Sequence, residues 1–256
     1  MSQDIYFKTI GEKTGQDGAP VFWGHGWGQD HRAFLPLAQS LGAAGRHYVV
    51  DFPGFGKSSA PEEIWGTQDY ADALAGFIKS QTDEKIIWIG HSFGCRVGLQ
   101  LAAKYPELVA GMCLIAAAGL PRKRPLWHKI YYGARVKLFK FLKKLIPLGL
   151  SQDWLYTKFG SADYRSAGPL REIFVKVVNE DLSAVAGTVT CPVTLIHGTK
   201  DTETPPEIGE RLSRIIPHSK LILMDGFDHY SILSGAQHQV VHRIKSFMKE
   251  IQDADG

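Results

Sequence analysis

The chain has 256 residues, 44% of them hydrophobic and 21% charged, with a formal net charge of +3. This composition suits one sizeable domain with a buried core, and the lack of internal repeats or low-complexity segments excludes a repeat architecture. No apolar run approaches the roughly 18 residues that span a bilayer, and the N-terminal sequence shows no secretory signal.

Apolar runs of strand length alternate with helix-period patterns along the chain. The predicted strands are residues 5–9, 19–24, 48–50, 86–90, 112–117, 193–196 and 221–224. The predicted helices are residues 34–41, 67–80 (capped by Thr67 or Asp69), 93–105, 206–215 and 233–251. This alternation predicts an α/β fold, with a mostly parallel sheet covered by helices on both faces.

The regular alternation stops between about residues 120 and 190. This span is too long for a loop and has apolar content of its own. We expect a helical cap at residues 120–190, inserted in a core formed by residues 1–119 and 191–256. The cap would lie over the carboxyl edge of the sheet, where sites in α/β proteins form.

Three cysteines indicate the cellular compartment. Cys95, Cys113 and Cys191 are odd in number, far apart and never in a C-x-x-C pair. Each lies in or beside an apolar strand or helix pattern. We therefore expect buried thiols and a cytoplasmic protein.

The pattern Gly90-x-Ser92-x-Gly94 lies between a predicted strand and a predicted helix. A strand that turns at once into a helix strains the residue at its apex, and only glycine fits two positions to either side. The serine hydroxyl then stands clear of the sheet, beside the first amide of the helix. Such a pattern also occurs as a simple turn, but the flanking elements favour Ser92 as a catalytic nucleophile.

A serine nucleophile needs a base, and the base needs a group that orients it. Of ten histidines, His229 follows the last predicted strand and so lies at the same sheet edge as Ser92. Asp201 follows the strand at residues 193–196 and is the best-placed acid, with Glu203 as its nearby rival. The strand at residues 112–117 ends in alanines and offers no carboxylate. We predict Ser92, Asp201 and His229 as catalytic residues.

The chain order Ser92, Asp201, His229 resembles that of the α/β-hydrolase superfamily. Five motifs carry this resemblance over nearly the whole chain: His25-Gly26-Trp27-Gly28, Asp51-x-Pro53-Gly54-x-Gly56-x-Ser58, Gly90-His91-Ser92-Phe93-Gly94, His197-Gly198-x-x-Asp201 and Asp228-His229. The resemblance implies an α/β-hydrolase fold with an inserted helical cap. It also implies that the backbone N–H groups of Trp27 and Phe93 form an oxyanion hole.

Other side chains in these motifs are expected to support the site rather than to react. His25 would brace the oxyanion loop, His91 would shape the pocket, and His197 would be a satisfied core histidine. No His, Cys or carboxylate cluster has metal-ligand spacing, so we expect neither a metal nor a cofactor.

Charge is spread unevenly, and the cap carries most of the asymmetry. Residues 108–152 contain no Asp or Glu but nine of the 29 basic residues, so the rest of the chain is net negative. If residues 127–145 form a helix, with 100° of rotation per residue, they have one broad apolar stripe, with lysines on the other side. The stripe is Trp127, Ile130, Tyr131, Ala134, Leu138, Phe141, Leu142 and Leu145. We expect the stripe to pack over the pocket, with Trp127 and Tyr131 binding substrate.

These observations predict a serine hydrolase that cleaves a carboxylic ester or thioester through an acyl-enzyme. The substrate would be a small-molecule ester with an apolar acyl or aryl part. The basic cap leaves an acidic carrier protein or an anionic membrane surface as candidate partners, and we expect no nucleic-acid partner. Two alternatives remain: a C–C bond hydrolase of the ring-cleavage type that uses the same triad, and a non-enzymatic member of the fold that binds a ligand or partner.

Overall fold

The computed structural model describes residues 4–11, 18–42, 45–123, 125–148, 151–159 and 162–255. Its centre is a seven-stranded sheet with the order β1-β3-β2-β4-β5-β6-β7. The strands are β1 (Phe7–Ile10), β2 (Val21–Gly24), β3 (His47–Val50), β4 (Ile86–His91), β5 (Val109–Ile115), β6 (Val193–Gly198) and β7 (Ser219–Met224). Only β1 is antiparallel to its neighbour, so the carboxyl ends of the other strands meet at one edge.

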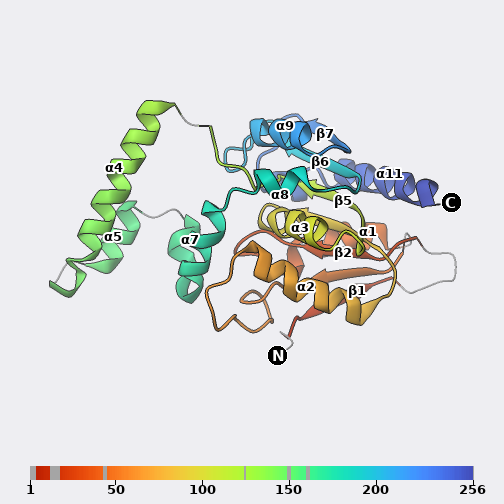
Figure 1. Ribbon diagram of the computed structural model, residues 1–256, viewed down its shortest axis with the longest axis horizontal. Coiled ribbons are helices and arrows are strands. Elements are labelled where there is room, and N and C mark those ends of the chain that lie inside the picture. Colours follow the sequence, from red (N-terminus) through yellow and green to blue (C-terminus); the bar gives the residue numbers. More distant parts are fainter. Residues whose placement is uncertain are drawn as a thin grey trace.

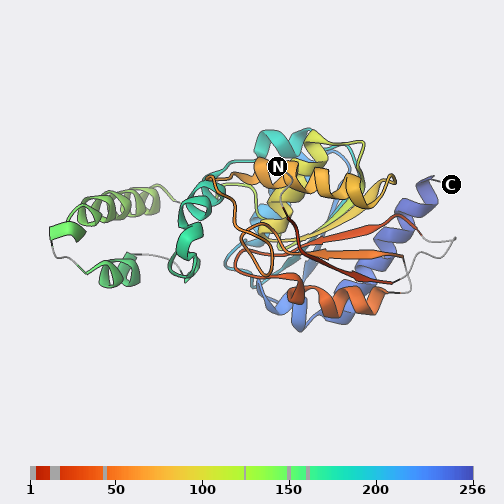
Figure 2. The ribbon, with the colours of Figure 1, turned by 90° about the horizontal axis from the view of Figure 1, so that it is seen from below.

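Helices cover both faces of the sheet, as the alternating pattern predicted (Figures 1 and 2). One face carries α2 (Thr67–Gln81), α3 (Phe93–Lys104), α8 (Ser183–Gly187) and α9 (Pro206–Ile215). The other carries α1 (Leu35–Leu41), α10 (Ser231–Ser234) and α11 (Gln237–Asp255). Strands β2 and β4 are buried along their whole length because both of their faces are covered.

Two local predictions need correction. The predicted helix at residues 233–251 is two helices, α10 and α11, separated at Gly235 and Ala236. The N-cap of α2 is Gly66 rather than Thr67 or Asp69, and the Asp69 carboxylate accepts a hydrogen bond from the Gly66 N–H at 2.6 Å. Asp69 therefore stabilises the helix start from its third position, as in the second half of a capping box.

The thiols are as expected at two of three positions. Cys95 and Cys113 are buried, and burial raises the pKa of both thiols. Cys191 is only partly buried. Among the described helices, none is long and apolar enough to cross a bilayer.

The segment between β5 and β6 has two parts with different surroundings. Its second part, α7 (Arg171–Asn179) and α8, packs on the body and buries Ile173, Phe174 and Val177. Its first part, α4 (Leu126–Lys143) and α5 (Gln152–Phe159), projects away from the sheet (Figures 1 and 2). The short helix η2 (Ile146–Leu148) lies between α4 and α5 in the chain, and the short helices α6 (Ala162–Ser166) and η3 (Gly168–Leu170) lie between α5 and α7. On the body, η1 (His31–Ala33) precedes α1.

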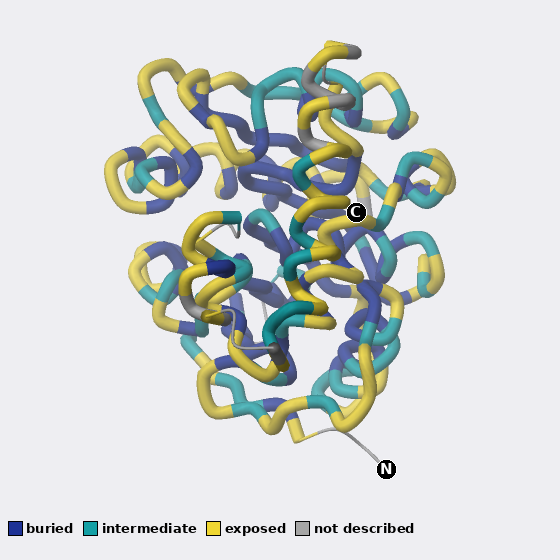
Figure 3. The backbone as a smooth tube through the Cα atoms, turned by 90° about the vertical axis from the view of Figure 1, so that its left-hand side faces the viewer, coloured by how far each residue is buried: buried dark blue, intermediate teal, exposed yellow. Residues whose placement is uncertain are grey.

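The predicted apolar stripe of α4 does not cover the site. Trp127, Tyr131, Leu138 and Phe141 are exposed, by 65%, 55%, 48% and 60%. Figure 3, in which this end of the molecule faces the viewer, shows buried strands behind helices that are mostly exposed or intermediate. The helix period identified an amphipathic helix correctly, but it could not say whether the protein itself covers the apolar side.

Candidate active site

Ser92 lies at a strained turn between β4 and α3. Its backbone has φ +49° and ψ −102°, a left-handed conformation that side-chain-bearing residues seldom adopt. A Cβ at Gly90 would lie 2.7 Å from the Gly94 carbonyl oxygen, and one at Gly94 would collide with the Gly24 carbonyl oxygen. The two glycines are therefore required for β2, β4 and α3 to pack this closely, and the sequence pattern reflects that requirement.

The His229 and Asp201 side chains meet at the carboxyl edge of the sheet, on the loops after β7 and β6. His229 Nδ1 lies 2.8 Å from Asp201 Oδ2, and both side chains are buried. The backbone N–H groups of Glu203 and Thr204 each donate to Asp201 Oδ1 at 2.8 Å. Burial opposes ionisation of Asp201, but its hydrogen bonds with His229 and Thr204 outweigh burial and lower the pKa of the carboxyl. The arrangement holds an ionised acid against the imidazole.

Thr204 is a site residue that the sequence patterns missed. Its Oγ1 lies 2.9 Å from Asp201 Oδ2, 3.0 Å from the Ala116 carbonyl oxygen and 3.2 Å from His229 Nδ1. The hydroxyl therefore connects the acid and the base to the end of β5. A threonine three residues after an aspartate is too common for sequence to indicate this role.

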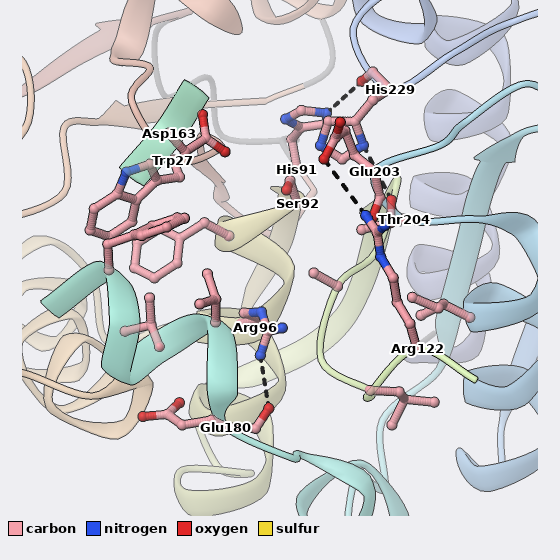
Figure 4. Close-up of a pocket in the computed structure, with 18 of the residues that line it drawn as sticks. Trp27, His91, Ser92, Arg96, Arg122, Asp163, Glu180, Glu203, Thr204 and His229 are labelled. Carbon is pink, nitrogen blue, oxygen red and sulfur yellow. Dashed lines mark hydrogen bonds and ion pairs between the residues drawn. The ribbon is translucent and has the colours of Figure 1, made fainter. Parts of the chain in front are cut away.

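Ser92 and His229 both line a pocket of about 650 Å³. Figure 4 shows Ser92, His91, His229 and Thr204 gathered at one end of this pocket, with Arg96 and Glu180 at the other. Apolar side chains, including Leu120, Phe174, Val177 and Ile208, line the space as well. The pocket thus joins a polar end that contains Ser92 to an apolar wall suited to a hydrocarbon group.

The predicted oxyanion-hole residues are adjacent to each other beside Ser92. The rings of Trp27 and Phe93 pack edge to face with centroids 5.4 Å apart, and both residues line the pocket. Within the described part of the chain, neither backbone N–H donates to a protein acceptor. The oxyanion-hole role of these two N–H groups stays a prediction.

His25 holds the oxyanion loop in place. Its Nδ1 donates to the Gly26 carbonyl oxygen at 2.8 Å, and its Nε2 accepts from the Phe52 N–H at 3.1 Å. Burial lowers the pKa of His25 to about 4, so the ring is neutral at pH 7 and can keep this tautomer. The structure agrees with the expected bracing role.

His91 positions the backbone of His229. Its Nε2 donates to the His229 carbonyl oxygen at 2.9 Å, across 138 residues of sequence. Burial, with the neighbouring His229, lowers the pKa of His91 to about 3, so this ring is also neutral at pH 7.

His197 is less fully paired than expected: its Nε2 accepts from the Ala117 N–H, but its buried Nδ1 has no partner among the described residues.

Arg96 is a second residue that the sequence did not single out. Its guanidinium lines the pocket, is buried, and donates to the Glu180 carbonyl oxygen at 3.1 Å. The Glu180 carboxylate accepts from the Thr67 N–H at 3.1 Å and from the Thr67 hydroxyl. These bonds fasten the end of α7 to the starts of α2 and α3, and so fix one wall of the pocket.

The remaining predicted site residues lie elsewhere. Trp127 and Tyr131 are on α4, and neither is among the pocket-lining residues.

Asp30, His31 and Asp51 bring potential metal-ligand atoms within 4.8 Å of one another, which their sequence spacing had not indicated. Asp30 is already paired with Arg32, and Asp51 with the backbone and ring of His31, so these carboxylates act as structural acceptors.

Comparisons with known proteins agree with this geometry. Residues 21–243 match the model of a family described as the alpha/beta hydrolase family. A pimeloyl-[acyl-carrier protein] methyl ester esterase of Neisseria meningitidis serogroup B is 30% identical over 234 residues, which cover 85% of this chain and 88% of that protein.

Two solved esterases share the fold at low sequence identity. An esterase of Exiguobacterium antarcticum superposes with a TM-score of 0.73 at 21% identity, covering 96% of each chain. A thermophilic esterase of Thermogutta terrifontis superposes with a TM-score of 0.69 at 20% identity, covering 96% of this chain and 93% of that one.

The sheet order, the strained serine turn and the family match define the class of this protein. The chain belongs to the alpha/beta hydrolase family. Its activity follows from the relatives named as esterases: it is a carboxylic ester hydrolase.

Proposed function

We propose that Ser92, His229 and Asp201 form a catalytic triad that hydrolyses the ester through an acyl-enzyme. The observation that carries the proposal is the 2.8 Å bond between His229 Nδ1 and Asp201 Oδ2, in a pocket that also contains the strained Ser92. Asp201 accepts the Nδ1 proton, which leaves Nε2 of His229 as the basic nitrogen.

The chemistry then follows in two halves. His229 removes the proton of Ser92, whose Oγ attacks the ester carbonyl, and the Trp27 and Phe93 N–H groups bind the resulting oxyanion. The tetrahedral intermediate collapses, His229 protonates the departing alcohol, and an ester between the acyl group and Ser92 remains. Water deprotonated by His229 attacks this acyl-enzyme, releases the carboxylic acid and restores Ser92.

For the substrate, we propose a methyl ester of an acyl chain held on an acyl carrier protein. Support comes from the relatives, which are named as pimeloyl-[acyl-carrier protein] methyl ester esterases, and from the apolar pocket wall formed by Leu120, Phe174, Val177 and Ile208.

A fluorophosphonate probe and a short p-nitrophenyl ester test the triad. We expect covalent labelling of Ser92, detected by mass spectrometry, and loss of both labelling and turnover in Ser92→Ala and His229→Ala. Labelling at another residue, or turnover retained in Ser92→Ala, would refute the assignment.

Product analysis tests the substrate class. Methyl esters of a medium-length acyl chain are compared in free and carrier-bound form, with a thioester and a dienone acid as alternatives. Preference for the carrier-bound methyl ester supports the proposal. Faster cleavage of the thioester, or of the C–C bond in the dienone acid, would replace it.

A further inference from the structure

The helices α4 (Leu126–Lys143) and α5 (Gln152–Phe159) form a projection, here called the arm, whose surface the proposed function does not explain. Figure 1 shows the arm projecting from the body. Leu120, Pro121 and Arg122, which precede it in the chain, line the pocket, so the arm starts at the pocket's edge. Its two helices hold each other through Phe139, whose ring lies 6.1 Å from Tyr156 and 5.9 Å from Phe159.

The two helices of the arm expose large apolar side chains. They are Trp127, Val136, Leu138 and Phe141 of α4 and Trp154 of α5, each 48–65% exposed. At 100° per residue, Trp127, Leu138 and Phe141 fall within one face of α4, which is different from the face that carries Phe139. Exposed apolar surface gathered on one element, rather than scattered, indicates a site of contact with something apolar.

The same helix carries a strong positive charge. Lys137, Lys140, Lys143 and Lys144 lie on or directly after α4, and all four are exposed. The sequence of α4 contains no acidic residue. The arm therefore combines an apolar face with a basic one on a single projecting helix, which is the pattern of helices that lie in the plane of a membrane interface.

Three features favour a lipid surface over a folded acidic protein. The apolar face is on the outside of a projection rather than in a groove, so a deformable surface fits it better than a rigid one. Tryptophan is favoured at the boundary between lipid headgroups and acyl chains. Lysine side chains can extend their ammonium groups to headgroup phosphates while their methylenes stay near the apolar layer.

We propose that the arm docks on an anionic lipid bilayer, with the Trp127, Leu138 and Phe141 face of α4 inserted at the headgroup level and the lysines bound to lipid phosphates. Because the arm starts at the pocket's edge, docking would place the pocket near the membrane surface. The proposal does not depend on the triad.

Sedimentation with lipid vesicles tests the docking. Purified full-length protein is mixed with vesicles of phosphatidylcholine, with or without added phosphatidylglycerol. We expect binding to the anionic vesicles that weakens with salt, and little binding to the neutral ones. The pair Lys140→Gln and Lys144→Gln should weaken binding roughly 30-fold, since each lysine near an anionic surface strengthens binding about fivefold. The pair Leu138→Ser and Phe141→Ser should weaken it about tenfold or more.

Matched controls lie on the body. Lys245→Gln with Lys249→Gln removes two exposed charges from α11, and Leu223→Ser removes a 47% exposed apolar side chain from β7. These variants should bind vesicles like the parent protein. Turnover of a short, water-soluble p-nitrophenyl ester should be unchanged in all arm and control variants, which separates a docking defect from a defect in the triad.

Several outcomes would overturn the proposal. They are no preference for anionic vesicles at low salt, equal weakening by the arm and body variants, and capture of an acidic carrier protein by the arm while vesicles are ignored. A loss of short-ester turnover in Leu138→Ser with Phe141→Ser would instead assign the apolar face to the pocket.

Discussion

The most decisive single substitution is Asp201→Asn, because the structure dictates which way the new amide must face. Asp201 Oδ1 accepts two backbone N–H groups, from Glu203 and Thr204, each at 2.8 Å. Only an oxygen can accept both bonds, so the amide nitrogen of the asparagine must occupy the Oδ2 position, 2.8 Å from His229 Nδ1. The amide then donates to Nδ1, and the imidazole proton moves to Nε2, the nitrogen that has to accept the serine proton.

This wrong tautomer sets the expected magnitude. When the imidazole is correctly placed but its Nε2 is already protonated, it cannot accept the serine proton. This defect lowers turnover about 10⁴-fold, or by roughly 5–6 kcal/mol of transition-state stabilisation. The assay is kcat/KM on a short p-nitrophenyl ester at pH 7, with the melting temperature measured alongside. Because asparagine has the same shape as aspartate, the fold should survive. A loss of less than about tenfold in a folded variant would refute the assignment of Asp201 as the orienting acid.

Three further outcomes follow from the same contacts. Thr204→Val removes a hydroxyl that bonds the acid and should lower kcat/KM about 10–100-fold, with Thr204→Ser restoring most of it. Gly94→Ala places a Cβ against the Gly24 carbonyl oxygen and should lower the melting temperature as well as the turnover, measured by thermal unfolding. The free energy of unfolding should fall as pH drops below about 6.5, because His25 and His91 have lowered pKa values in the folded state and take up protons on unfolding. Each contributes about 1.4 kcal/mol per pH unit down to its folded pKa of about 4 or 3, and denaturant titrations at pH 7 and pH 5 measure the loss.

The parts of the molecule that sequence predicts well are those in which backbone geometry limits the choice of residue. The elbow requires glycine at positions 90 and 94, because β2, β4 and α3 leave no room for a side chain there. Likewise, β4 is buried along its whole length, so its run of apolar residues marks a central strand without further information. In both cases the constraint is local, so a short sequence pattern is enough to indicate it.

The contacts that escaped prediction depend instead on distant segments. His91 bonds a carbonyl 138 residues away, and Thr204 bonds one 88 residues away. Each is a common polar residue whose role depends on which loop the sheet brings opposite it. Parallel topology brings those loops to one edge, but it does not fix which hydroxyl or imidazole meets which carbonyl.

The surroundings of the arm also could not be predicted from the sequence, but for a different reason. Helical periodicity established that α4 has an apolar face and a basic face, and the structure retains both. Periodicity measures only how residues are arranged around their own axis, so packing on the body and contact with an outside surface produce the same pattern. What separates them is the exposure of Trp127, Leu138 and Phe141, together with lysines on the same helix and no acid to pair them within it. An apolar face that had evolved to cover the pocket would gain nothing from that charge, whereas an anionic bilayer uses the charge and the apolar face in one contact.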